Sequence, residues 1–263
     1  MTDIQTSASN ATKSGKLTFS QRRPVWAVVV IELLLMVAVA AAGTYATLKG
    51  LSYTAPVLLS FIPIALALIV YMTLRRRWGY YGFRSLKSIP KSGYIYYLPL
   101  LAVLVAISFK GFRPLTIQEI LFFLFFTLLV GFVEETVYRG LIFKTMLKKG
   151  AVAAIVTSSI LFSITHVLNA LSGQSLAATL LQLLYALLVG CALALLLLKN
   201  GNILPLIAFH FLHNLIQFLG VQTEYIPADV VVLVILAAQC AWLIASMKKR
   251  PAAAMIAPTG TVL

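Results

Sequence analysis

The chain has 263 residues, of which 61% are hydrophobic and 11% are charged, and its mean hydropathy is +0.97. Because a soluble domain carries about 25% charged residues, this composition excludes an ordinary soluble protein, and the hydrophobic content excludes disorder over most of the chain. The formal net charge of +14 comes from 21 basic and 7 acidic residues. Most basic residues cluster between long apolar segments, which is typical of a membrane protein that contacts anionic headgroups rather than of a nucleic-acid-binding surface. We therefore expect a lipid bilayer, and no nucleic acid, among its partners.

Eight apolar segments are long enough, or nearly so, to cross a bilayer, which requires about 20 residues. In chain order they cover residues 25–48, 55–74, 94–109, 116–139, 153–170, 176–198, 203–219 and 229–247, and the third and seventh are short. The loops between them leave no room for a soluble domain. The sequence therefore predicts an all-α polytopic membrane protein with a disordered cytoplasmic tail at 1–22, a single transmembrane helical domain at 23–247 and a cytoplasmic C-terminal tail at 248–263.

Lysine and arginine are distributed unevenly over the loops between these segments. If the N-terminus is cytoplasmic, 18 of the 21 basic residues lie on the cytoplasmic side, and only Lys49, Lys110 and Arg113 lie outside. Cytoplasmic loops of membrane proteins carry an excess of basic residues. This distribution predicts a multi-pass protein of the cell membrane with eight crossings and both termini in the cytoplasm.

Two adjacent acids, Glu134 and Glu135, lie near the end of the fourth apolar segment. Each charge near the centre of a bilayer costs about 2.5–3.5 kcal/mol, so two in succession indicate a function or a specific partner. Glu135 and Arg139 share a helical face at a spacing of four residues and can form an ion pair, whereas Glu134 points about 100° away. We interpret Glu135 and Arg139 as structural support and Glu134 as the chemical candidate, although both acids could be interfacial residues paired with Arg139 and Lys144. Glu32, inside the first segment, is expected to make a hydrogen bond facing a cavity and is assigned no role.

His166 lies in the fifth apolar segment, four residues after Phe162 and on the same helical face. A single histidine in an apolar helix is often a hydrogen-bonded packing residue. The position of His166 favours a role beyond packing, because Glu134 and His166 lie equally far along the chain on the two sides of the turn at Gly150. If the two helices form an antiparallel hairpin, the carboxylate and the imidazole lie at nearly the same level.

The seventh segment holds two more histidines. His210 and Asn214 are four residues apart and share a face, whereas His213 lies about 60° from that line, with Gln217 one turn beyond it. Either pairing could line a cavity, and the spacing alone does not choose between them.

A carboxylate and two imidazoles at one level inside a membrane can activate water. In a metal-dependent version, Glu134, His166 and His210 bind zinc and leave a coordination position open for water. In a metal-free version, Glu134, helped by His166, takes a proton from water, and His210 and Asn214 donate hydrogen bonds to the developing oxyanion. We expect either no cofactor or zinc, with a slight preference for none.

Three motifs, in order along the chain and on separate predicted helices, resemble those of a known family: Glu134-Glu135-x-x-x-Arg139, Phe162-x-x-x-His166 and His210-x-x-x-Asn214. They are similar to the motifs of the CPBP (CAAX protease and bacteriocin-processing) family, the Abi-type intramembrane proteases related to the Ras-converting CAAX endoprotease. The resemblance implies a CPBP-like core at about 116–219 within about eight transmembrane helices, and a conical intramembrane cavity.

The same resemblance implies roles for four residues. Glu134 would be the catalytic base and His166 its partner. His210 and Asn214 would stabilise the oxyanion, or His210 would be a metal ligand. The motif favours His210 over His213, because only His210 is followed by asparagine at the fourth place.

The predicted function is therefore that of an intramembrane endopeptidase that cleaves a peptide or a membrane-associated protein. Family members cleave peptides, in eukaryotes the last three residues of prenylated CAAX proteins. Two other functions stay open: a non-catalytic membrane interaction or bacteriocin-immunity protein, and a proton-coupled transporter that relays protons through the same acids and histidines. The sequence shows no inverted repeat, which argues against the transporter.

Overall fold

The computed structural model describes residues 18–171, 173–221 and 226–248, and all elements named in this part are helical, as predicted. The α-helices are α1 (Phe19–Arg22), α2 (Pro24–Leu48), α3 (Ala55–Leu74), α4 (Leu98–Ser108), α5 (Ile117–Glu135), α6 (Phe143–Met146), α7 (Ala151–Thr165), α8 (Leu168–Leu171), α9 (Leu176–Asn200), α10 (Leu204–Leu219) and α11 (Ile226–Lys248). Short 3₁₀ segments cover Leu86–Ser88, Lys91–Tyr97 and Leu147–Lys149, and Thr136–Ile142 form a π-helix. Of the predicted tails, residues 1–17 and 249–263 lie outside the described residues, and Phe19–Arg22 form a single helical turn.

Within the described part, seven helical stretches are long and apolar enough to cross a membrane. They are Pro24–Leu48, Ala55–Leu74, Lys91–Ser108, Ile117–Lys149, Ala151–Ala170, Leu176–Asn200 and Ala228–Lys248. The remaining predicted segment corresponds to α10, which is apolar but has only 16 residues. The protein is thus a multi-pass membrane protein, and its helices coincide with the eight apolar segments, of which the fourth continues well beyond its predicted end.

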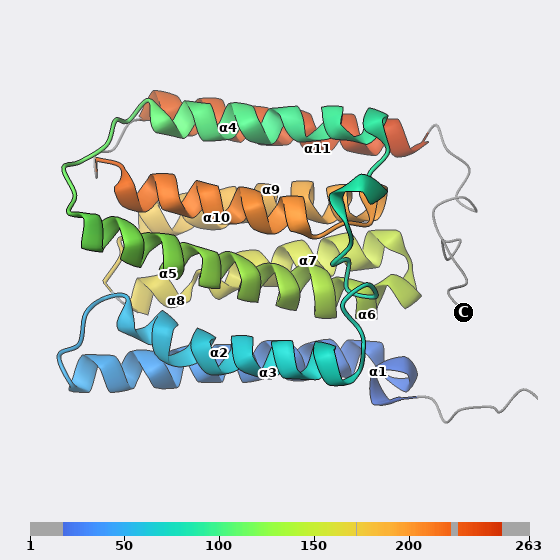
Figure 1. Cartoon of the computed structure of the whole chain (residues 1–263), viewed down its shortest axis with the longest axis horizontal. Coiled ribbons are helices and arrows are strands. Elements are labelled where there is room, and N and C mark those ends of the chain that lie inside the picture. The colour runs from blue at the N-terminus through green and yellow to red at the C-terminus, as the bar shows by residue number, and fades with distance from the viewer. Residues whose placement is uncertain (1–17, 172, 222–225, 249–263) are drawn as a thin grey trace, which may run out of the picture.

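The long helices lie side by side in a flat bundle (Figure 1). Helices α2 and α3 form one edge, α4 and α11 form the opposite edge, and α5, α7, α9 and α10 lie between them. The helix α1 and the last residue of α11 are at the same end of the bundle as the basic loop at 75–90 and the turn at 147–150. This placement of α1 and the end of α11 at one end of the bundle agrees with an even number of crossings.

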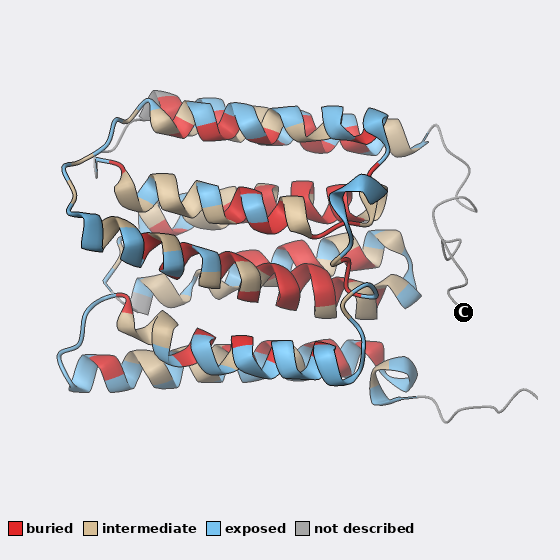
Figure 2. Ribbon diagram, viewed as in Figure 1, coloured by how far each residue is buried: buried red, intermediate tan, exposed pale blue. Residues whose placement is uncertain are grey.

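Burial is concentrated in the central helices, as Figure 2 shows. The edge helices expose apolar side chains such as Leu34, Leu66 and Val234, which is expected of surfaces that face lipid tails. Inside the bundle, α9 contributes the continuous buried series Ala192–Leu197. The core therefore lies around the helices that carry the three sequence motifs.

Helix α5 begins with a capping box, in which the Thr116 hydroxyl accepts from the backbone N–H of Glu119 and the Glu119 carboxylate accepts from the backbone N–H of Thr116. At its other end the helix continues without a break into the π-helical segment Thr136–Ile142. Such wide turns change the direction of the following side chains and are frequent at functional sites. This one begins directly after the adjacent acids Glu134 and Glu135.

Candidate active site

The site forms where α5 approaches α10 closely at Gly131. A Cβ added at this glycine would lie 3.2 Å from the backbone nitrogen of Phe211 and 3.3 Å from the carbonyl oxygen of Ile207. A side chain here would be tighter than most Cβ contacts, so glycine favours this short distance between the two backbones. The close approach brings the acids at the end of α5 against His210 of α10.

The imidazole of His210 lies between the two adjacent carboxylates. Its Nδ1 is 2.9 Å from Oε1 of Glu135, and its Nε2 is 3.4 Å from Oε2 of Glu134. The carboxylate of Glu135, paired with Arg139, can only accept, so Nδ1 of His210 carries the proton of this hydrogen bond. Nε2 is left to face Glu134, whose side chain is 16% exposed. Glu134 thus has a partner after all, but one that lies far away in the sequence, on another helix.

The predicted ion pair between Glu135 and Arg139 is present and completely buried. Nη1 of Arg139 lies 3.0 Å from Oε1 of Glu135, and both side chains have 0% exposure. The guanidinium also lies over the ring of Phe162, 4.3 Å from its centroid. One oxygen of Glu135 therefore joins Arg139 of its own helix to His210 of another, a link that the local spacing of the sequence could not reveal.

His166 follows the last residue of α7 and contacts the same aromatic ring. Its Nδ1 is 2.9 Å from the carbonyl oxygen of Phe162, and the two rings lie 5.2 Å apart. Since a carbonyl only accepts, Nδ1 carries the proton and Nε2 of a neutral His166 keeps the lone pair. The ring of Phe162 also lies 5.8 Å from that of His210. Among the described residues the structure gives no hydrogen bond between His166 and Glu134.

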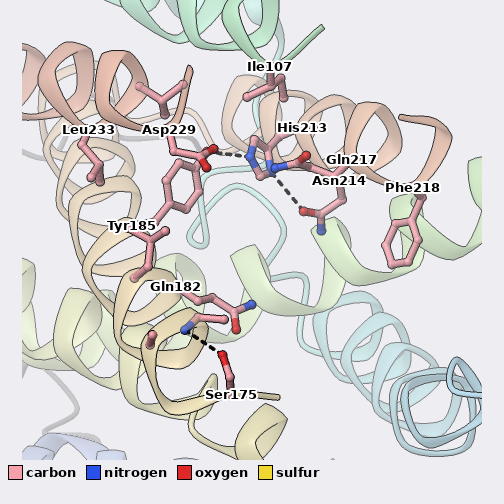
Figure 3. Close-up of a pocket in the computed structure, with 14 residues that line it drawn as sticks. Ile107, Ser175, Gln182, Tyr185, His213, Asn214, Gln217, Phe218, Asp229 and Leu233 are labelled. Atoms are coloured by element: carbon pink, nitrogen blue, oxygen red, sulfur yellow. Dashed lines mark hydrogen bonds between the residues drawn. The ribbon is translucent and has the colours of Figure 1, made fainter. Parts of the chain in front are cut away.

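Asn214 is placed on the same helix as His210 but is hydrogen-bonded elsewhere. Its Oδ1 lies 3.1 Å from Nδ1 of His213, and Nε2 of His213 lies 2.6 Å from the hydroxyl of Tyr185 on α9 (Figure 3). The spacing in the sequence did not decide the role of His213, and Tyr185 was not predicted as a site residue. A tyrosine inside an apolar helix gives little signal by itself, because most such residues are interfacial or packed.

A cavity of about 680 Å³ opens beside these three residues, between α4, α9, α10 and α11. Its wall combines amide side chains, including Gln182 and Asn214, with apolar ones such as Leu233 and Phe218 (Figure 3). Asn214 therefore belongs both to the predicted catalytic set and to a cavity large enough for part of a peptide.

Glu32 makes a hydrogen bond, as expected, but it does not line the cavity described above. Its Oε1 accepts from the hydroxyl of Thr165 at 3.0 Å, and the hydroxyl of Tyr138 also contacts that of Thr165. Thr165 precedes His166, and Tyr138 lies one turn after Glu134. This polar chain connects α2 to both helices of the predicted hairpin.

The predicted zinc ligands do not assemble into one group. Within the described ranges, no three side chains of His, Cys, Asp or Glu are grouped so that they could hold a metal ion. Glu134 and His210 face each other, whereas His166 is held by Phe162. The described part of the structure thus brings together two of the three predicted ligands.

The comparisons with known proteins agree with the motifs. Residues 116–216 match the model of the family described as type II CAAX prenyl endopeptidase Rce1-like. The match runs from the N-cap of α5 into α10 and includes all three motifs. This region is therefore similar to the CAAX-protease family, which indicates a peptidase. A comparison with curated proteins found no match to the chain.

Proposed function

We propose that this protein cleaves a peptide or a segment of a membrane-associated protein with a water molecule activated by Glu134, without a metal. The observation that supports this most is the position of His210, whose two ring nitrogens face Glu135 and Glu134 at 2.9 and 3.4 Å. A base and a hydrogen-bond donor for the reaction are thereby held next to each other.

Charge balance indicates the protonation state in which this cluster works. Glu134 and Glu135 as carboxylates, with Arg139 as a guanidinium, leave one negative charge in a largely buried site. An unbalanced buried charge is costly. His210 as an imidazolium balances it and can donate through both nitrogens, to Glu135 and toward the reacting carbonyl.

The reaction then proceeds through proton transfers between named groups. Glu134 takes a proton from water as the water oxygen attacks the scissile carbonyl carbon, and Nε2 of His166 accepts the second hydrogen bond of the same water. The carbonyl oxygen becomes an oxyanion, which accepts hydrogen bonds from Nε2–H of His210 and from the side-chain amide of Asn214. Glu134 finally returns its proton to the leaving amine as the C–N bond breaks.

The substrate is a peptide chain that reaches Asn214 through the adjacent cavity. Amide groups in the wall suit the N–H and C=O groups of an extended peptide, and the apolar wall suits aliphatic side chains. An aliphatic peptide segment of a membrane-associated protein fits this chemistry, which does not require a prenyl group.

The test is cleavage of internally quenched peptides by purified protein in liposomes. The peptides tested are a randomised library and a peptide ending in Cys-aliphatic-aliphatic-X, the latter with and without S-farnesylation. Glu134→Gln is expected to lower kcat by about 10²–10⁴-fold, which is the usual contribution of a general base. Cleavage that survives this substitution would contradict the mechanism.

The matched control is Glu119→Gln, the same substitution at the start of the same helix. Glu119 is partnered with Thr116 and Arg113, not with any residue of the site. This variant is expected to keep wild-type kcat. Wild-type protein that cleaves none of the peptides, while still binding one of them, would favour a non-catalytic interaction protein instead.

A further inference from the structure

We propose that Tyr185 and His213 are positioning residues that fix the orientation of the Asn214 side-chain amide, so that its N–H group points to the oxyanion. This inference rests on the proposed function, because it deepens the role assigned there to Asn214. It concerns Tyr185, which lies outside the three sequence motifs, and His213, which occupies an unspecified position of the third.

The hydrogen bonds of His213 have one consistent direction. Its Nδ1 lies 3.1 Å from Oδ1 of Asn214, an oxygen that only accepts, so Nδ1 carries the proton. Nε2 of the neutral ring then has the lone pair and accepts from the hydroxyl of Tyr185 at 2.6 Å. Tyr185 thus selects the tautomer of His213, as a second partner commonly does for histidine.

The consequence for Asn214 follows from the two ends of its amide. With Oδ1 engaged by His213, the Nδ2 group is the end that can donate to a ligand. If the amide were free to flip, its flipped orientation would present an oxygen to the oxyanion, which is repulsive. A donor contributes to catalysis only if it is already oriented when charge develops.

Packing keeps this arrangement in place. The rings of Tyr185 and His213 lie 5.2 Å apart at 25°, and the ring of Phe209 lies 5.9 Å from His213 on its own helix. Both Tyr185 and His213 line the cavity together with Asn214 (Figure 3). His210 lies one turn before Asn214, so the two proposed oxyanion donors share a face of α10.

Kinetics of the peptidase provide the first test. Tyr185→Phe and His213→Leu are expected to lower kcat by about 10- to 100-fold with little change in KM, as misplacement of a catalytic group does. His213→Asn is expected to retain more activity than His213→Leu, because an asparagine amide nitrogen can occupy the place of Nδ1. The control is Tyr97→Phe, which removes a tyrosine hydroxyl that accepts from Asn200 at 3.1 Å and belongs to no part of the proposed site; it should leave kcat unchanged.

A double-mutant cycle separates this inference from the proposed function. In an Asn214→Ala background, Tyr185→Phe should have no further effect, because the group that it positions is gone. If Asn214→Ala itself is silent, the oxyanion role fails and the inference fails with it. If Asn214→Ala lowers kcat but Tyr185→Phe and His213→Leu do not, only the positioning role is wrong.

A spectroscopic readout does not depend on turnover. The chain has only three histidines, so ¹⁵N-histidine labelling of the full protein in micelles gives three imidazole spin systems. His213, identified by its loss in His213→Leu, should be a neutral ring protonated at Nδ1, and Tyr185→Phe should shift its Nε2 resonance. A ring protonated at Nε2, or one unaffected by Tyr185→Phe, would overturn the proposal even in an inactive preparation.

Discussion

The Nδ1 atom of His210 lies 2.9 Å from Oε1 of Glu135, an oxygen that also holds the Arg139 guanidinium at 3.0 Å. The second acid of the pair is therefore not only an internal brace of its own helix. It fixes the ring of His210 on a neighbouring helix and leaves Nε2 facing Glu134. The stability of the buried ion pair and the geometry of the reacting groups thus depend on one carboxylate.

The main effect of substituting Glu135 should be a loss of folding stability. Glu135→Gln leaves the fully buried Arg139 without a counter-charge, and breaking such a pair costs about 3–5 kcal/mol. We expect a clear fall in the thermal unfolding midpoint in detergent. The double variant Glu135→Gln with Arg139→Met should recover most of it, because removing both charges is often nearly neutral. A single variant that unfolds at the wild-type temperature would contradict the importance of the pair.

Gly131 should set the distance between Glu134 and His210. In Gly131→Ala the new methyl group meets backbone atoms at 3.2 and 3.3 Å, so α5 and α10 must separate slightly. We expect kcat to fall by about tenfold or more, since small misplacements of reacting groups are costly. Gly140→Ala is the matched control, because its nearest atoms lie at 3.7 Å, in ordinary contact. Equal activity of the two variants would show that the close approach is unimportant.

The contribution of Glu32 to stability should depend on its hydrogen-bond acceptor and not on its negative charge. Glu32→Gln keeps an oxygen for the Thr165 hydroxyl and is expected to unfold at or above the wild-type temperature. Glu32→Ala removes that acceptor from a buried position and should cost about 1–3 kcal/mol. The measurement is thermal unfolding of both variants in the same detergent. A glutamine variant as unstable as the alanine variant would indicate that the negative charge itself is required.

Peptide cleavage should be insensitive to metal chelators. The base and the proposed donors are side chains of the protein, and the three predicted zinc ligands are not grouped in the described part of the structure. Activity after dialysis against 1,10-phenanthroline is expected to equal that of untreated protein. Loss of cleavage that zinc restores would instead assign Glu134, His166 and His210 to a metal site that forms on metal binding.

The sequence alone was sufficient for the features that depend on local pattern. Hydropathy located the helices because about 20 apolar residues are needed to cross a bilayer, and α2 and α3 begin and end within a residue of the predicted segments. The ion pair of Glu135 with Arg139 followed from a spacing of four residues on one helix. The three motifs pointed to the family, and the family match covers all of them.

Only the tertiary structure decided which of these side chains meet. His210 contacts both acids because Gly131 lets two helices approach closely, and no local spacing predicts a contact between segments so far apart in the sequence. Tyr185, one partner of His213, and Thr165, the partner of Glu32, likewise lie on other helices. The physical reason is that the length and direction of a membrane helix depend on the hydrophobicity of the residues in that helix. The rotation of neighbouring helices and the distance between them depend instead on how their side chains pack. The sequence determined which groups are available for chemistry, and the packing of α5 against α10 determined their geometry.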